Sequence, residues 1–173
     1  DVARMWTDHS GISFIVTAVK EDSDIRITFQ KKGCHAVGKL AAEVPKDKYT
    51  MALGELKHTW GKEDVRRVIL HHFGHALGLI HEHERPDVAI PWDVAKTIKY
   101  FEKHYNWGPQ KTIDNVLRPK YRYNYIENVK TEFDPMSIMA YPIPIELVDQ
   151  DHPGYDSWAR TVKDDLRSEL SDV

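Results

Sequence analysis

The chain has 173 residues, 41% of them hydrophobic and 10% aromatic, which is enough for one globular domain with a sizeable core. Its formal net charge of −3 gives no basis for binding nucleic acid or an anionic membrane, and no apolar run approaches membrane-spanning length. Ten histidines are many for this length, and five of them fall between positions 71 and 83, a clustering that indicates a metal site.

The first half of the chain predicts one short helix and three strands. Residues 1–9 have the apolar spacing of an amphipathic helix, and the apolar, β-branched residues 12–19 predict a strand. Residues 25–29 alternate strictly between apolar and polar, which predicts a half-buried strand with its three apolar side chains facing inward. Residues 49–54 predict a third, short strand.

Cys34 is the only cysteine, so the chain has no intrachain disulfide. We interpret Cys34 as a small packed residue in a turn, with a Cys–His metal pair formed with His35 as the alternative.

A helix is predicted after Thr59 or Gly61, either of which is a plausible cap. Glu63 and Asp64 then lie in the first turn, where the positive end of the helix favours them. The expected buried face consists of four apolar residues: Val65, Val68, Ile69 and Phe73.

Three histidines give this helix and the turn after it a metal-binding pattern. His71 and His75 are four residues apart and therefore share one face of a helix. Gly78 tolerates the left-handed conformation that ends helices, so the chain can turn back and deliver His81 as a third ligand. Three imidazoles leave a fourth position open, as in catalytic zinc sites.

The second half predicts two helices followed by irregular structure. Residues 93–105 form the first helix, with Val94, Thr97, Ile98, Phe101 and Tyr105 as its inner stripe. Residues 110–117 predict another short helix. Residues 118–155 show little periodicity but many aromatic residues, which favours an irregular subdomain over disorder, and residues 157–170 again have helical spacing.

Two motifs resemble those of a known peptidase family. Residues 71–81 read His-His-Phe-Gly-His-Ala-Leu-Gly-Leu-Ile-His, similar to the metzincin signature His-Glu-x-x-His-x-x-Gly-x-x-His, and the likeness continues through residues 82–87. Residues 134–141, Asp-Pro-Met-Ser-Ile-Met-Ala-Tyr, resemble the Met-turn of the same clan. Over roughly residues 1–145 the chain resembles astacin-like metallopeptidases.

The resemblance implies an α/β fold of the metzincin type. A twisted, mostly parallel sheet and the active-site helix make the upper subdomain, about residues 1–81, above an irregular lower subdomain, about residues 82–173. Such domains begin with a strand and the front of the first helix, so we expect the single catalytic domain 1–173 to continue upstream of Asp1. The strand at 49–54 corresponds to the family's edge strand, which either holds an extended peptide or is an ordinary sheet edge.

The resemblance also implies the chemistry. His71, His75 and His81 bind zinc, and metal-bound water hydrolyses a peptide bond of a peptide or protein substrate in extended conformation. Met139 forms a hydrophobic floor beneath the ligands. Tyr141 stabilises the oxyanion, with a buried core tyrosine as the alternative. By family likeness alone the protein is secreted, and its oligomeric state is open.

Two further residues after the third histidine have structural interpretations. Glu82 matches a family glutamate that anchors the trimmed N-terminus, but this chain has no matching N-terminal segment, so we interpret Glu82 as structural. His83 is interpreted as a solvated or hydrogen-bonded loop histidine rather than a ligand.

His72 departs from the family pattern, because the general-base glutamate belongs at its position. An imidazole that accepted a proton there would become a cation beside a dication, which is electrostatically unfavourable. Three accounts remain open: a change that inactivates a peptidase, an additional ligand or redesigned base, and a weak base in a slow peptidase. The alternative functions are a non-proteolytic metalloenzyme, for which copper or iron would suit the nitrogen-rich site, and a peptide-binding pseudopeptidase.

Overall fold

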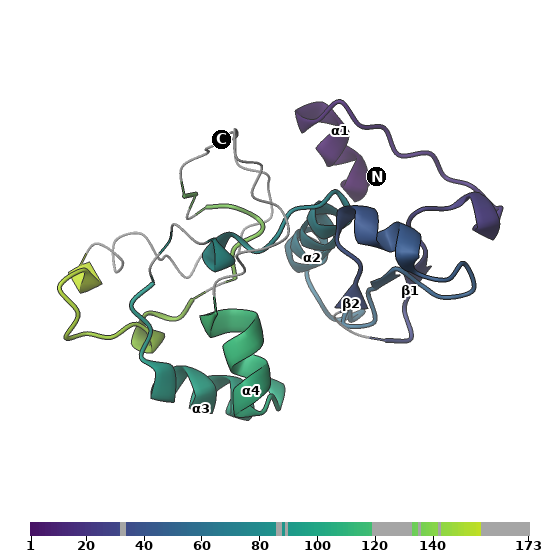
Figure 1. Cartoon of the computed structure of the whole chain (residues 1–173). Coiled ribbons are helices and arrows are strands. Elements are labelled where there is room, and N and C mark those ends of the chain that lie inside the picture. The colour runs from purple at the N-terminus through teal and green to yellow at the C-terminus, as the bar shows by residue number, and fades with distance from the viewer. Residues whose placement is uncertain are drawn as a thin grey trace. The chain divides into compact units, whose positions relative to one another are not determined.

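Short helices and strands joined by irregular segments make up the structure, a computed structural model shown in Figure 1. The residues that it describes are 1–31, 34–85, 88, 90–118, 133–134, 136–141 and 143–156. Among them the chain separates into two compact units, the first spanning Asp1–Ile80 and the second beginning at His81. The predicted helix at 157–170 and most of the loop before residue 133 lie outside the described residues.

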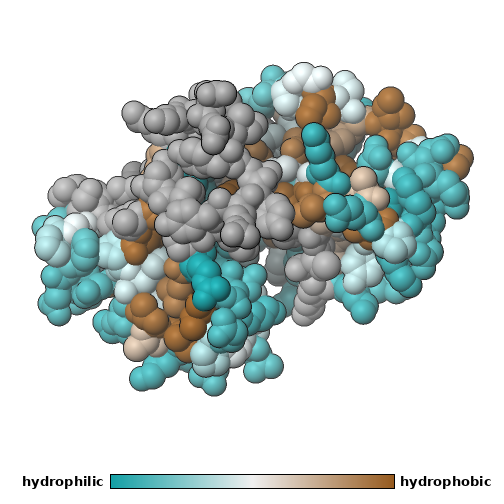
Figure 2. Space-filling view, viewed as in Figure 1, coloured by the Kyte–Doolittle hydropathy of each residue, from teal (hydrophilic) through white to brown (hydrophobic). Residues whose placement is uncertain are grey.

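The first unit begins with the predicted helix, formed by η1 (Val2–Arg4) and α1 (Met5–His9). The strand predicted at 12–19 is wrong: the segment makes no ladder with any strand of the described chain, and it leads into η2 (Lys20–Asp22). Ile15 and Val16 are each 89% exposed. Figure 2 shows apolar side chains at the right of the view, where the segment that follows α1 runs. A β-ladder requires a neighbouring strand, and the hydrophobic periodicity of one segment does not show whether such a strand is present.

The sheet of the first unit is small and mixed. It contains β1 (Ile27–Thr28), β2 (Cys34–His35) and β3 (Met51–Ala52) in the order β1-β3-β2. β1 is parallel to β3 and β2 is antiparallel to it. The expectation that 49–54 forms an edge strand is therefore wrong, because β3 has a partner on both sides. No extended peptide can add to a strand whose backbone groups are already paired.

The inward face predicted for residues 25–29 is also wrong. Ile27 is 42% exposed and Phe29 is 68% exposed, whereas Arg26 is buried. The Arg26 guanidinium donates hydrogen bonds to the carbonyl oxygens of Lys48 at 2.7 Å and Val44 at 3.1 Å. These loop carbonyl oxygens accept hydrogen bonds from the buried guanidinium cation, which lowers the cost of burying it. Arg26, a polar residue of the alternating pattern, therefore faces inward.

The helix that carries the histidines is α2 (Lys62–Ala76), which begins after its N-cap Gly61 as predicted. Gly78 has φ +105°, the left-handed conformation that stops the helix, and the Leu79 amide donates back to the Gly74 carbonyl at 3.0 Å. The predicted buried face is shifted: the buried residues of α2 are Leu70, His72, Gly74 and His75. The imidazoles of His72 and His75 thus lie on the inner side of the helix, as Leu70 does.

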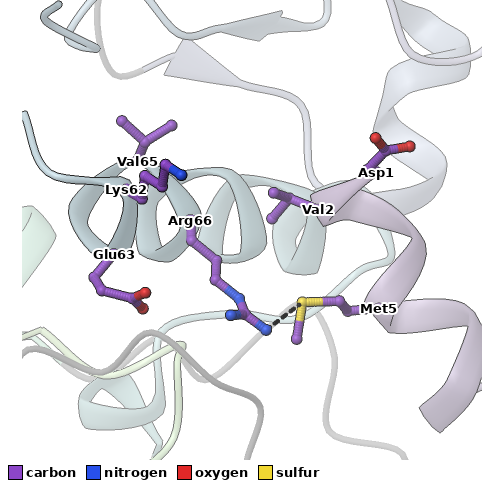
Figure 3. Close-up of a pocket in the computed structure, with 7 residues that line it drawn as sticks. All are labelled: Asp1, Val2, Met5, Lys62, Glu63, Val65 and Arg66. Carbon is purple, nitrogen blue, oxygen red and sulfur yellow. Dashed lines mark hydrogen bonds between the residues drawn. The ribbon is translucent and has the colours of Figure 1, made fainter.

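A cavity of about 500 Å³ opens between the N-terminal turns and the start of α2 (Figure 3). In it the Arg66 guanidinium points toward the Met5 sulfur, at 3.2 Å. None of the described residues that line this cavity is a histidine, so we assign it no part in the metal chemistry.

The second unit contains η4 (Glu82–Glu84), α3 (Val94–Tyr105), α4 (Pro109–Thr112), the π-helical turn η5 (Ile113–Leu117) and η6 (Ile145–Leu147). The helices predicted at 93–105 and 110–117 are confirmed. Thr97 and Phe101 of the expected inner stripe are buried, but Val94 and Tyr105 are half exposed. Two apolar clusters stabilise the unit: one comprises Val88, Ile90, Ile143 and Val148, the other Phe101, Val116 and Leu147. Within the described residues no helix is both long and apolar enough to cross a membrane.

The start of α3 depends on the charge of one carboxylate. The Asp93 side chain accepts a hydrogen bond from the Lys96 amide at 3.0 Å, and this bond, with the Lys96 ammonium, lowers the pKa of Asp93 below its ordinary value of 3.8. A lowered pKa in the folded state means that the cap stabilises α3 above pH 3.8 and is lost as pH falls through the lower, folded-state pKa.

We expect the Lys96 amide NMR shift to titrate with a midpoint below 3.8. In the Asp93→Ala variant this inflection should disappear, and α3 amides should exchange faster with solvent at neutral pH. A midpoint at or above the ordinary aspartate value would contradict the capping contact.

Candidate metal centre

Two imidazoles of the first unit point their outer nitrogens at each other. The Nε2 atoms of His71 and His75 are 3.1 Å apart, because the four-residue spacing on α2 stacks the two side chains. The Nδ1–H of His75 donates to the Leu79 carbonyl at 2.8 Å. A carbonyl can only accept, so this bond leaves the lone pair of His75 on Nε2.

The distance between these nitrogens fits a metal ion. A tetrahedral ion with metal–nitrogen bonds of about 2.0–2.1 Å separates its ligand atoms by roughly 3.3 Å. The observed 3.1 Å is close to that edge. Leu79, which orients His75, lies directly after Gly78, so the glycine that ends the helix also places the orienting carbonyl. The first unit therefore presents two corners of a nitrogen site.

His72, at the base position, is held by a carboxylate that the sequence did not reveal. Its Nε2 lies 2.8 Å from Oε1 of Glu55, and the two side chains are only 9% and 21% exposed. Glu55 comes from the turn after β3, 17 residues earlier in the chain, and no local pattern marks it. Among the described residues His72 belongs to no group of metal-ligating side chains, which argues against its being an additional ligand.

The second unit opens with the third predicted ligand, His81, which is 7% exposed. The ring centroid of Tyr141 lies 4.3 Å from that of His81 and 4.8 Å from that of His83. His83 is buried and accepts a hydrogen bond from the Tyr141 amide at 3.4 Å, in agreement with the hydrogen-bonded interpretation. Burial, reinforced by the Glu84 charge, raises the pKa of Tyr141, so its phenol stays protonated at neutral pH and can donate a hydrogen bond.

The predicted Met-turn is a real turn in the second unit. The Met136 amide donates to the Asp134 carboxylate at 2.8 Å, and the Ala140 amide donates to the Ser137 carbonyl at 3.0 Å. Met139 is 3% exposed while Met136 is 44% exposed, so Met139 is the inward methionine. Its carbonyl accepts from the Glu82 amide at 3.1 Å, which ties the turn to the residues after His81.

Glu82 has the structural position expected of it. Its Oε1 accepts from the Asp134 amide and from the Arg85 guanidinium, both at 3.1 Å. Burial raises the pKa of Glu82, while these two donors oppose that effect. The carboxylate thus links the segment after His81 to the start of the Met-turn.

Comparison with known proteins places the chain in a family. Residues 2–145 match the model of the peptidase family described as Astacin. A solved structure, "Structure of myroilysin", is 28% identical, with a TM-score of 0.80, over 99% of this chain and 78% of that one. A second, "Crystal structure of myroilysin", is 26% identical, with a TM-score of 0.55, over 93% and 74%. A search of curated proteins found no match.

These matches confirm the predicted family and the metzincin-type fold, with a smaller and more mixed sheet than expected. Members of the family are zinc-dependent, typically extracellular peptidases. With its paired imidazoles, its Met-turn and its matched residues, the chain is a metallopeptidase domain of the astacin peptidase family.

Proposed function

We propose that this domain binds one zinc ion through His71, His75 and His81 and acts on peptide bonds, with hydrolysis impaired by His72. The facing Nε2 atoms of His71 and His75 are the observation that carries the proposal, because the Leu79 carbonyl fixes the lone pair of His75 where a ligand needs it. The third ligand follows from the family spacing of the motif. Bound zinc would supply Lewis-acid activation of water and of the scissile carbonyl.

Tyr141 is proposed to stabilise negative charge on the carbonyl oxygen of the substrate. A phenol is protonated at neutral pH and can therefore donate a hydrogen bond to an oxyanion. The proximity of its ring to His81 supports this role over that of a remote core tyrosine. Met139 is proposed as the apolar floor of the site. We also propose that the substrate is a peptide in extended conformation and that the protein is secreted; the peptidase family and its typically extracellular members support both.

His72 is proposed to be a poor replacement for the glutamate base. Its Nε2 faces the Glu55 carboxylate at 2.8 Å, so that nitrogen carries a proton toward Glu55 and the lone pair is left on Nδ1. Taking a proton there would make the ring a cation beside the zinc dication, which is electrostatically unfavourable. Loss of a positioned general base typically lowers the rate by ~10²–10⁴-fold. The histidine at the base position favours a second candidate function, a pseudopeptidase that binds zinc and peptides but cleaves peptides slowly or not at all.

Zinc titration tests the metal site. We expect the metal-free chain to bind one zinc ion per molecule in competition with a chromogenic chelator. His75→Ala should weaken binding strongly, because it removes one of the facing nitrogens, and His71→Ala and His81→Ala should do the same. His58→Ala is the matched control, since His58 is exposed. Equal affinity of the parent and the three ligand variants would refute the proposed site.

A further inference from the structure

A buried carboxylate lies against the histidine that opens the second unit. Glu84 is 2% exposed, and its Oε2 lies 3.3 Å from Nδ1 of His81. The turn η4 causes this proximity, because side chains three residues apart eclipse in a 3₁₀ turn, and the Glu84 amide donates to the His81 carbonyl at 3.0 Å. In the short sequence His-Glu-His-Glu, residues 81–84, the geometry of the turn therefore places the Glu84 carboxylate beside the His81 ring.

The chemistry of the pair selects one form of the imidazole. A carboxylate removed from water needs donors, since its burial is otherwise costly. The negative charge of an ionised carboxylate at ion-pair distance stabilises a proton on the nitrogen nearest to it. In neutral His81 the proton then resides on Nδ1, and the lone pair is left on Nε2.

We infer that Glu84 is a positioning residue for His81: its carboxylate, at ion-pair distance from Nδ1, favours a proton on that nitrogen and leaves Nε2 as the ligand atom. The inference deepens the proposed function and rests on it. His75 has a comparable arrangement, in which Nδ1 makes a hydrogen bond to the Leu79 carbonyl. Such partners of ligating histidines typically change metal affinity by 10–100-fold when removed.

A different reading of the same residues is a separate cation site made by His81, His83 and Glu84, whose ligand atoms lie close together. The rings argue against it. The planes of His81 and His83 are stacked at 16°, with centroids 5.1 Å apart. An imidazole lone pair lies in the ring plane, so two nearly parallel rings cannot aim at one ion. In addition, Nδ1 of His83 already accepts from the Tyr141 amide.

Two measurements on the full chain test the inference. Long-range ¹H–¹⁵N NMR of the metal-free protein above pH 8 reports which nitrogen of His81 carries the proton. Chelator competition with zinc alone reports affinity. For Glu84→Ala we expect the Nδ1–H form of His81 to lose population and zinc affinity to fall 10–100-fold. Glu146→Ala is the matched control, because that carboxylate is exposed on η6 of the same unit and should leave both readouts unchanged.

An Nε2–H form of His81 in the parent chain would overturn the inference, as would a folded Glu84→Ala variant with unaltered zinc affinity. Where alanine unfolds the chain, Glu84→Leu decides, since it has a comparable volume and offers no acceptor oxygen; parental affinity and an unchanged tautomer would again overturn it. Failure of the parent chain to bind zinc refutes the proposed function instead. In that case the tautomer of His81 in the metal-free protein alone tests whether Glu84 holds the proton on Nδ1.

Discussion

Replacing His72 by glutamate is expected to raise the rate of peptide cleavage by ~10²-fold or more. A carboxylate at this position offsets the charge of the metal, orients water by a strong hydrogen bond and takes its proton, and such a base contributes ~10²–10⁴-fold. His72→Glu and the parent are compared on an internally quenched peptide library, with bound zinc quantified in each sample. The parent's kcat/KM on the best substrate is the reference.

Glu55 complicates the single substitution and provides its control. The new carboxylate would stand beside Glu55, whose Oε1 now lies 2.8 Å from the His72 ring, and like charges at that range raise a carboxyl pKa or drive the groups apart. We therefore expect the double variant with Glu55→Gln to cleave faster than His72→Glu alone. His72→Gln, which lacks the charge, should stay as slow as the parent. Zinc-loaded His72→Glu variants that remain inactive would show that His72 is not what limits catalysis.

The parts of the fold that sequence predicted are those encoded within a few residues. Gly61 and Gly78 bound α2 as expected, and Asp93 caps α3, because caps and left-handed stops depend on the residue itself. The spacing of His71 and His75 likewise fixes a shared helix face before any tertiary contact.

The parts that failed depend on partners distant in the chain. The segment 12–19 has strand composition but no neighbouring strand in the described structure, and β3 lies in the middle of the sheet because β2 pairs with its second side. Alternation at 25–29 predicted the wrong inner face, since carbonyls near residues 44 and 48 accept from Arg26. Hydrophobic periodicity carries no information about such acceptors.

The candidate site divides in the same way. The spacing of residues in the sequence predicted its proposed ligands and the Met-turn. The proximity of Glu84 to His81 depends on a local turn, so the sequence could have revealed it. Glu55 could not be found, because nothing near it indicates that the turn after β3 meets α2. The carboxylate that contacts His72 is thus a tertiary feature, and its effect on catalysis has to be measured because the motif does not reveal it.

Truncating Leu70 to alanine is expected to destabilise the first unit by about 2–5 kcal/mol, the usual range for a fully buried leucine. Leu70 is 0% exposed on the helix that carries His71 and His75, and its carbonyl accepts from the Trp6 indole at 3.1 Å. Urea unfolding followed by tryptophan fluorescence and hydrogen exchange of α2 amides measure the loss. Leu79→Ala is the matched control, since that side chain is 41% exposed and only its backbone carbonyl orients His75. Equal losses in the two variants would mean that the inner face of α2 is not the core of this unit.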